Sequence, residues 1–460
     1  MTDMIKIFYI LFLLGFLYYL TIRIFILKDP FKKKEWYITL IVLGLSLVFY
    51  VRFIIHDLII TDPSDEAMYV TLAEEVSRGL TPPISGPGFV YIILLFNSIS
   101  GWPLDNVTAL MGILISGLLL PFIYILYKEN GGSREIAAYS CLILIVTSYF
   151  LWPYIESRPQ QFGLLLVFAG AFFYNFYLTK GKYLVLFIMV GVFTFFFHIL
   201  SFLVLISLVS CLWWFRYVEG RSYFRQMFWP AILIGSGLLI FFSPLQMYSH
   251  MNGGVKWMFK MSELGFLRRG PVILILFALG ISALIVVTYF FRKKRVIERI
   301  RNLDKRHLNK FVPFFVSIIV LALVVQFFLD MDVHRSKYRD SFILFMVFQI
   351  GNILFGAFFV RSYCRYIREN DLDDPYFRSV TILMLIGLAS LIVSIFLPMN
   401  FNNWSIRMIN YWTVFAAPII ARDIMDLSPG WRKTLAFALP VLIVLSLINI
   451  SRDQTIFGYP

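Results

Sequence analysis

Cysteine, histidine and nucleotide-binding motifs are scarce or missing in this sequence. Its 460 residues include 3 cysteines and 5 histidines. Cys141, Cys211 and Cys364 stand far apart, in or beside apolar segments, and this spacing suggests neither a disulfide framework nor a zinc site. No Gly-x-x-x-x-Gly-Lys-Ser/Thr motif is found, and no strand–turn–helix phosphate motif either, so we expect no nucleotide site.

Charge is scarce as well, because only 15% of the residues are charged while 60% are hydrophobic. A helix that crosses a bilayer needs roughly 20 mostly apolar residues, since its backbone groups must be satisfied within the segment. We therefore predict an all-α polytopic membrane protein with about 12–14 transmembrane helices, as a single transmembrane domain over residues 1–460. The expected spans are 4–27, 37–56, 105–127, 135–152, 160–178, 183–197, 199–216, 228–247, 271–291, 311–329, 340–360, 380–397, 409–421 and 433–450.

Two details of this topology stay open. Residues 183–216 are compatible with one long tilted helix as well as with two, and the apolar block Phe89–Ser100 is short enough to be interfacial or re-entrant. The first span is longer than a signal-peptide core and lacks a small-residue cleavage site, so we expect it to remain as a helix.

The net charge of +14 predicts an orientation and excludes one class of partner. Lysine and arginine collect in short loops that alternate along the chain, and short cytoplasmic loops hold such an excess. An outside N-terminus places these loops in the cytoplasm: Lys32–Lys34, Lys128–Arg134, Lys180–Lys182, Arg216–Arg225, Arg292–Arg295, Arg361–Arg368 and Arg422–Lys433. Because the cations do not form a basic face with interleaved aromatic residues, we expect no nucleic-acid partner.

The first external loop, residues 56–88, holds five carboxylates after Asp57, at positions 62, 65, 66, 74 and 75. Tyr69, Leu72, Ala73 and Val76 recur at helical spacing and predict a short amphipathic interfacial helix, which Gly79 and the following prolines end. Its acidic start has an ordinary explanation, with Asp62 as N-cap and Asp65 and Glu66 facing the helix dipole. It also has a functional one, because a carboxylate fixed at the membrane surface can take a proton from an acceptor hydroxyl.

The pattern Asp65-Glu66-Ala67-x-Tyr69, with Ala73, Gly79 and Gly86-Pro87-Gly88 beyond it, resembles the GT-C superfamily of membrane glycosyltransferases. The likeness is to the dolichyl-phosphate-mannose and aminoarabinose transferase type, although the Lys-Pro-Pro signature is absent, so the subgroup stays open. The resemblance implies a catalytic core over 37–215, including loop 56–88, and a lipid-donor side formed by 216–460. It also implies Asp65 and Glu66 as catalytic residues and Tyr69 as a binding residue.

A second external loop carries Glu156 and Arg158 between the fourth and fifth spans, and it resembles the Arg-Pro-acid element of many GT-C members. The resemblance implies that both residues contact donor or acceptor. The alternative is a local ion pair at a helix entrance, since charges at membrane ends are normal.

His198 interrupts an apolar stretch near the predicted outer end of the sixth span. A polar side chain there needs a partner, so it is either a satisfied core histidine or a substrate or metal ligand. No second histidine or cysteine follows at ligand spacing. If a divalent metal binds, we expect Asp65, Glu156 and His198 to share it.

Four further cations lie on the predicted outer side, where positive charge is usually rare: Arg335, Lys337, Arg339 and Arg407. Arginine and lysine suit a lipid phosphate through charge-assisted hydrogen bonds. The alternative is that they contact headgroups or pair with Asp330, Asp332 and Asp340.

These observations favour a glycosyltransferase of the cell membrane that moves a sugar from a polyprenyl-phosphate donor to an external protein, glycolipid or polymer, with Asp65 as base. No cofactor is expected beyond a possible divalent metal. A lipid or sugar flippase or transporter and a non-catalytic assembly subunit are the alternatives. A transporter is expected to show internal repeats and mid-membrane charges, whereas the polar residues here cluster at one face.

Overall fold

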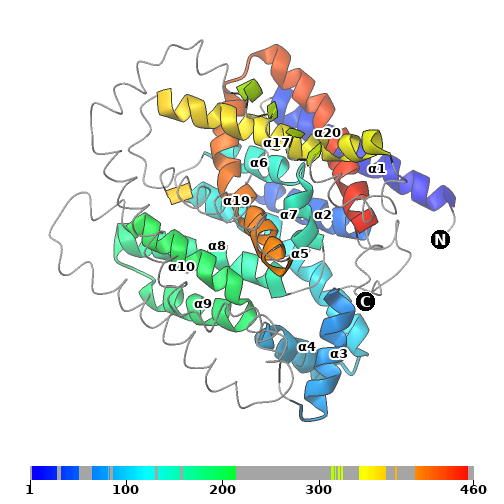
Figure 1. Ribbon diagram of the computed structural model, residues 1–460, viewed down its shortest axis with the longest axis vertical. Helices are drawn as coiled ribbons and strands as arrows, with labels where there is room; N and C mark the ends of the chain where they lie inside the picture. The colour runs from blue at the N-terminus through cyan, green and yellow to red at the C-terminus, as the bar shows by residue number, and fades with distance from the viewer. Residues whose placement is uncertain are drawn as a thin grey trace.

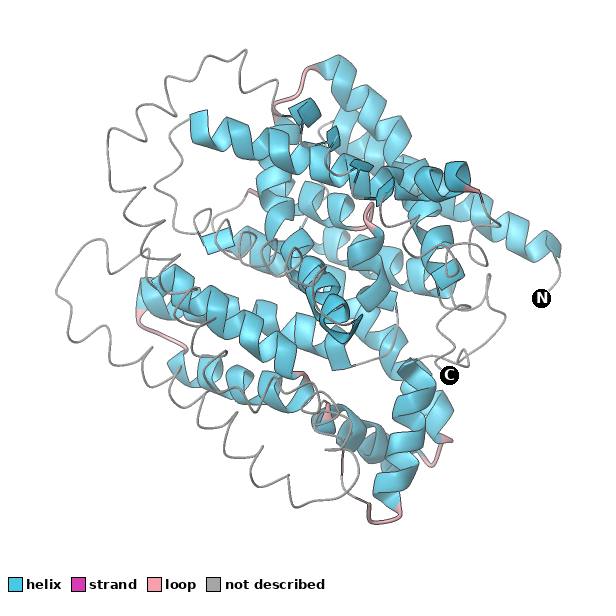
Figure 2. Cartoon of the chain, viewed as in Figure 1, coloured by secondary structure: helices cyan, strands magenta, loops and turns pink. Residues whose placement is uncertain are grey.

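The computed structural model is helical throughout the part of the chain that it describes, and it contains no strand there (Figure 2). That part comprises residues 3–27, 33–50, 65–80, 82, 86–129, 133–155, 159–213, 341–368, 379–380 and 399–453, with a few positions between 312 and 324. Five of the described helices are long and apolar enough to cross a membrane. The predicted all-α, multi-pass architecture is thus confirmed. The spans expected at 228–247, 271–291 and 380–397 lie almost wholly outside the described residues.

Six of the spans expected in the N-terminal half coincide with described helices, three of which are shorter than a bilayer crossing requires. The six helices are α1 (Asp3–Thr21), which continues as the π-helical turn η1 (Ile22–Ile26), α2 (Lys33–Phe49), α5 (Leu104–Glu129), α8 (Pro159–Lys180), α9 (Leu184–Phe197) and α10 (Ile199–Trp213). Residues 184–213 therefore form two helices, because the chain adopts an extended conformation at His198. Along α9, Val185, Ile188 and Val192 are exposed, as apolar side chains facing lipid are.

The C-terminal part that is described contains α17 (Phe342–Arg368), α19 (Met399–Met425) and α20 (Pro429–Asp453). α19 is longer than the expected span 409–421. It begins at Met399 and includes a polar stretch, residues 402–407, whose low hydropathy places the predicted start of the span too late. α19 packs on α6 (Arg134–Leu144) and α17, while α20 packs on α1 and α17 (Figure 1). Helices from the two ends of the chain therefore share one core.

The span expected at 135–152 is broken in the structure into α6 and α7 (Ser148–Ile155). Distant helices satisfy the backbone groups that the break releases. The Asn352 Oδ1 atom on α17 accepts from the Ser148 backbone N–H at 3.1 Å and from the Thr147 hydroxyl at 2.7 Å, and the Ser446 hydroxyl on α20 donates to the Val146 carbonyl. Within a bilayer such breaks persist only where neighbouring helices supply these bonds.

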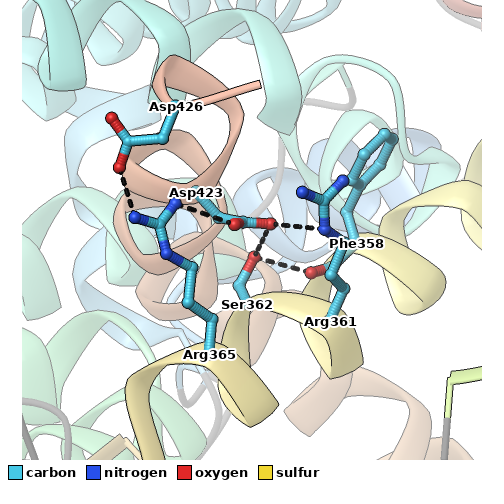
Figure 3. A network of polar contacts seen from close by, with 6 residues as sticks. All are labelled: Phe358, Arg361, Ser362, Arg365, Asp423 and Asp426. Carbon is cyan, nitrogen blue, oxygen red and sulfur yellow. Dashed lines mark hydrogen bonds and ion pairs between the residues drawn. The ribbon is translucent and has the colours of Figure 1, made fainter. Parts of the chain in front are cut away.

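An ion-pair network joins α17 to α19 at the end that we predict to be cytoplasmic (Figure 3). Asp423 is 2% exposed and pairs with Arg361 at 3.3 Å and with Arg365 at 3.2 Å. Arg365 also reaches Asp426, which is exposed, at 2.6 Å. A buried carboxylate needs such partners, and the network fixes the far end of α19.

Candidate functional site

The acidic motif Asp65-Glu66 begins a helix, α3 (Asp65–Ser77), as predicted. Gly79 ends it in a left-handed conformation, with its N–H bonded to the Val76 carbonyl and the Leu80 N–H bonded to the Glu75 carbonyl. This pair of bonds is the Schellman arrangement, in which glycine is favoured. Gly79 therefore ends the helix, as the sequence predicts.

The buried face of α3 consists of Glu66, Tyr69, Val70 and Ala73, and it packs against α4 (Pro87–Ser100) and α5. Leu72 and Val76, the other members of the expected stripe, are only partly buried against the same cluster. Compared with the predicted apolar stripe, the buried face of α3 is therefore shifted toward Glu66, which is 3% exposed. Glu74 on the same helix is exposed. α3 directs one carboxylate of its first turn into the protein.

Gly86 marks the place where α3, α4 and α8 meet. It precedes α4 with φ +86°, and a Cβ at this position would lie 2.5 Å from Pro159 Cγ and 3.3 Å from the Tyr69 hydroxyl. Both the backbone conformation and the lack of space require glycine there. The first turn of α8 therefore sits directly beside the motif helix.

A chain of aromatic rings continues this contact toward α9. Tyr69 and Phe89 stack edge to face at 5.2 Å between ring centroids, Phe89 meets Phe162 at 5.4 Å, and Phe162 meets Phe197 at 5.1 Å. These distances are typical of favourable aromatic pairs. Tyr69 is thereby connected through packed side chains to the residue that precedes His198.

His198 caps the start of α10 with its side chain. Its Nδ1 atom accepts a hydrogen bond from the Ser201 backbone N–H at 3.2 Å and lies 2.7 Å from the Ser201 hydroxyl. Because the backbone N–H can only donate, Nδ1 is the unprotonated nitrogen and, in the neutral ring, Nε2 carries the proton. The expected role of His198 as a metal or substrate ligand stays a prediction.

Tyr411 of α19 completes the group around His198. Its hydroxyl hydrogen-bonds to Ser201 and lies 3.4 Å from His198 Nδ1. Gly163 of α8 lies against the same turn, where a Cβ would clash with Ser201 and approach His198 Cβ to 2.9 Å. The sequence reasoning found His198 alone, since hydroxyl residues and glycine within apolar helices carry no distinctive signal.

The loop with Glu156 and Arg158 is held at both ends by one polar cluster. The Gln161 amide nitrogen donates to the Tyr154 carbonyl at 2.6 Å and to Ser116 at 2.6 Å. Tyr154 precedes the loop and Gln161 follows it, so their contact ties the end of α7 to the start of α8. Residues 156–158 themselves lie outside the described residues.

The structure brings Glu66, Tyr69 and His198 to one end of the bundle. Asp65 is the first residue of α3, and Arg407 lies one helical turn before Tyr411 on α19; only their backbone is described. Glu156, Arg158, Arg335, Lys337 and Arg339 lie outside the described residues. Among the residues that are described, no group of three histidine, cysteine or carboxylate side chains is placed to hold a metal ion.

Comparison with known proteins gives one distant structural match and no match by sequence. No protein-family model and no curated protein matches the sequence. The chain is similar to the crystal structure of the Archaeoglobus fulgidus oligosaccharyltransferase, described as a complex with Zn and sulfate, at 13% identity and a TM-score of 0.47. The match covers 92% of this chain and 53% of that one, so the chain spans about half the length of that protein.

Proposed function

We propose that this membrane protein is a glycosyltransferase that moves a sugar from a polyprenyl-phosphate donor to an acceptor at the outer membrane face. The supporting observation is the burial of Glu66, in the first turn of α3 and directly after Asp65. A carboxylate held in a buried position beside Asp65 is fixed in place, as a group that orients an acceptor must be. An interfacial helix that only needed solubility would expose this side chain, as α3 exposes Glu74.

In the proposed reaction Asp65 takes the proton of an acceptor hydroxyl, whose oxygen attacks the anomeric carbon of the donor sugar. The bond from that carbon to the phosphate oxygen breaks, and the lipid phosphate leaves with the electron pair. Arg335, Lys337, Arg339 and Arg407 stabilise the departing phosphate through charge-assisted hydrogen bonds. The displacement inverts the anomeric centre, and Glu66 or Glu156 orients the acceptor.

Transfer from a radiolabelled polyprenyl-phosphate sugar in membranes tests the assignment. Asp65→Asn removes the base while keeping the size of the side chain, and we expect turnover to fall about 10²- to 10⁴-fold. Glu66→Gln is expected to reduce turnover less. Glu74→Gln is the matched control, because it changes an exposed carboxylate of the same helix. Wild-type turnover by the Asp65→Asn variant would contradict the proposal.

The break between α6 and α7 is the observation that favours a transporter instead, because discontinuous helices often line transport sites. In this structure, however, Asn352 is bonded on both atoms of its amide, with Nδ2 donating to Ser148 and to Gln349. The polar groups at the break therefore satisfy one another. Movement of a fluorescent polyprenyl-phosphate sugar between leaflets of proteoliposomes, without transfer to any acceptor, would support the transporter.

A further inference from the structure

Two buried amide side chains in the described part of the chain have no hydrogen-bond partner there. Gln160, in the first turn of α8, is 2% exposed, and Asn410, in the middle of α19, is 0% exposed. Both the nitrogen and the oxygen of each amide are unpaired. Most buried side-chain polar atoms in proteins are bonded, so two amides with all four atoms unpaired require an explanation.

Both residues stand close in sequence to residues that contact the turn carrying His198. Gln160 precedes Gly163 by one helical turn, and Gly163 lies against Ser201 and His198. Asn410 immediately precedes Tyr411, whose hydroxyl bonds to Ser201. Gln160 on α8 and Asn410 on α19 therefore each lie within one helical turn, along their own helix, of a residue that contacts Ser201.

Two other amide side chains in the described part are bonded at least at the nitrogen, although the Gln161 oxygen is itself buried without a partner there. Gln161, the next residue on α8, donates from its amide nitrogen to Gly112, Ser116 and Tyr154. Asn352 is bonded on both amide atoms by Thr147, Ser148 and Gln349. Burying an unpaired amide costs stability, and a leucine or methionine of similar size would avoid that cost. Sequences retain such a cost mainly at functional sites.

We propose that Gln160 and Asn410 form a subsite that binds hydroxyl groups of the donor sugar, an inference that rests on the function proposed above. An amide presents one donor group and one acceptor beside each other without a charge, which matches neighbouring hydroxyls. A phosphate calls for cations, which Arg407, one turn before Tyr411 on α19, supplies in the proposed reaction. The subsite therefore binds the hydroxyl groups of the sugar, while the cations bind the phosphate of the lipid carrier.

Binding measurements on the purified full-length protein separate these two roles. The probes are polyprenyl-phosphate mannose, glucose and galactose, compared with polyprenyl phosphate that carries no sugar. We expect the wild type to bind at least one sugar lipid more tightly than the bare lipid. Gln160→Met and Asn410→Leu are each expected to weaken that sugar lipid about tenfold and to leave the bare lipid unchanged.

Thermal unfolding without lipid distinguishes a binding role from a structural one. Because neither amide has a partner in the described structure, Gln160→Met and Asn410→Leu are expected to keep or raise the Tm. Gln161→Met is the matched control, since it removes three bonds one residue further along and is expected to lower the Tm by more than about 2 °C. A large drop in Tm for Gln160→Met would instead indicate a structural amide and overturn the proposal.

The lipid measurements also distinguish the possible failures. If the variants keep the wild-type preference for the sugar lipid, the subsite is wrong while the proposed glycosyltransferase stands. If the wild type binds the bare and the sugar-bearing lipids equally, the subsite is likewise excluded. If it binds none of these lipids, the donor class itself is wrong, and the proposed function falls together with the subsite.

Discussion

The hydroxyl of Tyr411 hydrogen-bonds to Ser201, a residue 210 positions earlier in the chain. This bond ties α19 to the turn between α9 and α10. Arg407 lies one turn before Tyr411, so the bond also sets where the backbone of that arginine stands relative to His198. The late part of the chain is thereby connected to the part that carries the GT-C-like motif.

Tyr411→Phe removes this link and is expected to cost about 0.5–1.5 kcal/mol of unfolding free energy, the usual worth of one hydrogen bond. Thermal unfolding in detergent measures the change. Tyr124→Phe is the control, because the Tyr124 hydroxyl is buried without a partner in the described structure, and its loss should be neutral or stabilising. Equal losses for the two variants would show that the Tyr411 bond contributes nothing.

Gly163→Ala tests how closely α8 and α10 approach. The added methyl would clash with Ser201 and press on His198, so we expect a loss of about 1–3 kcal/mol from overpacking. Gly191→Ala in α9 meets nothing within 4 Å and should gain up to about 1 kcal/mol from better helix propensity. The same thermal measurement compares the two, and a neutral Gly163→Ala would mean that the helices can separate at little cost.

Asp423→Ala tests the ion-pair network between α17 and α19. It leaves Arg361 and Arg365 without their shared buried carboxylate, and we expect a loss of about 1–3 kcal/mol, reduced from the fully buried case because both arginines are partly exposed. Asp426→Ala, which removes an exposed partner of the same Arg365, should cost less than about 1 kcal/mol. A larger loss for Asp426→Ala than for Asp423→Ala would show that Asp426 contributes more to holding α17 against α19.

Neutralising Arg335 and Arg339 together tests the proposed phosphate contacts. Each charge-assisted bond is worth about 1.5–3 kcal/mol, so the apparent donor affinity should fall at least about tenfold while the unfolding temperature changes little. Arg78→Ala is the control, because this arginine directly after α3 is exposed and pairs only loosely with Glu74, at 3.6 Å. Unchanged donor affinity in the double variant would remove both arginines from the site.

The apolar runs of the sequence predicted most of the described helices because each run is long enough to require a bilayer. The apolar runs gave wrong helix ends where the hydrogen-bond partners of the backbone come from residues that are distant in the sequence. Ile145 and Val146 are as apolar as the residues around them, and only Asn352 and Ser446 explain why the helix breaks there. The predicted span 409–421 is shorter than α19 because Asn402, Asn403 and Arg407 lower the local hydropathy. The helix nevertheless continues through these residues.

The candidate site shows the same division between local and distant information. The acidic start of α3, its glycine end and the positive φ of Gly86 follow from residue types that act on their own backbone. The burial of Glu66 and the partners of His198 depend on where α4, α10 and α19 pack, and no local pattern encodes that. Ser201 and Tyr411 were therefore invisible in the sequence.

The broken helix of α6 and α7 also has a consequence for how the protein is made. A ribosome delivers the chain from its N-terminus, so the Val146 carbonyl and the Ser148 amide emerge long before Asn352 and Ser446, which follow at separations of 204 and 300 residues. Until those helices arrive, neither backbone group has its final partner, and each unsatisfied group in lipid costs several kcal/mol. We therefore expect this segment either to insert as a continuous helix, whose own turns satisfy these groups, or to stay hydrated until α17 and α20 are inserted.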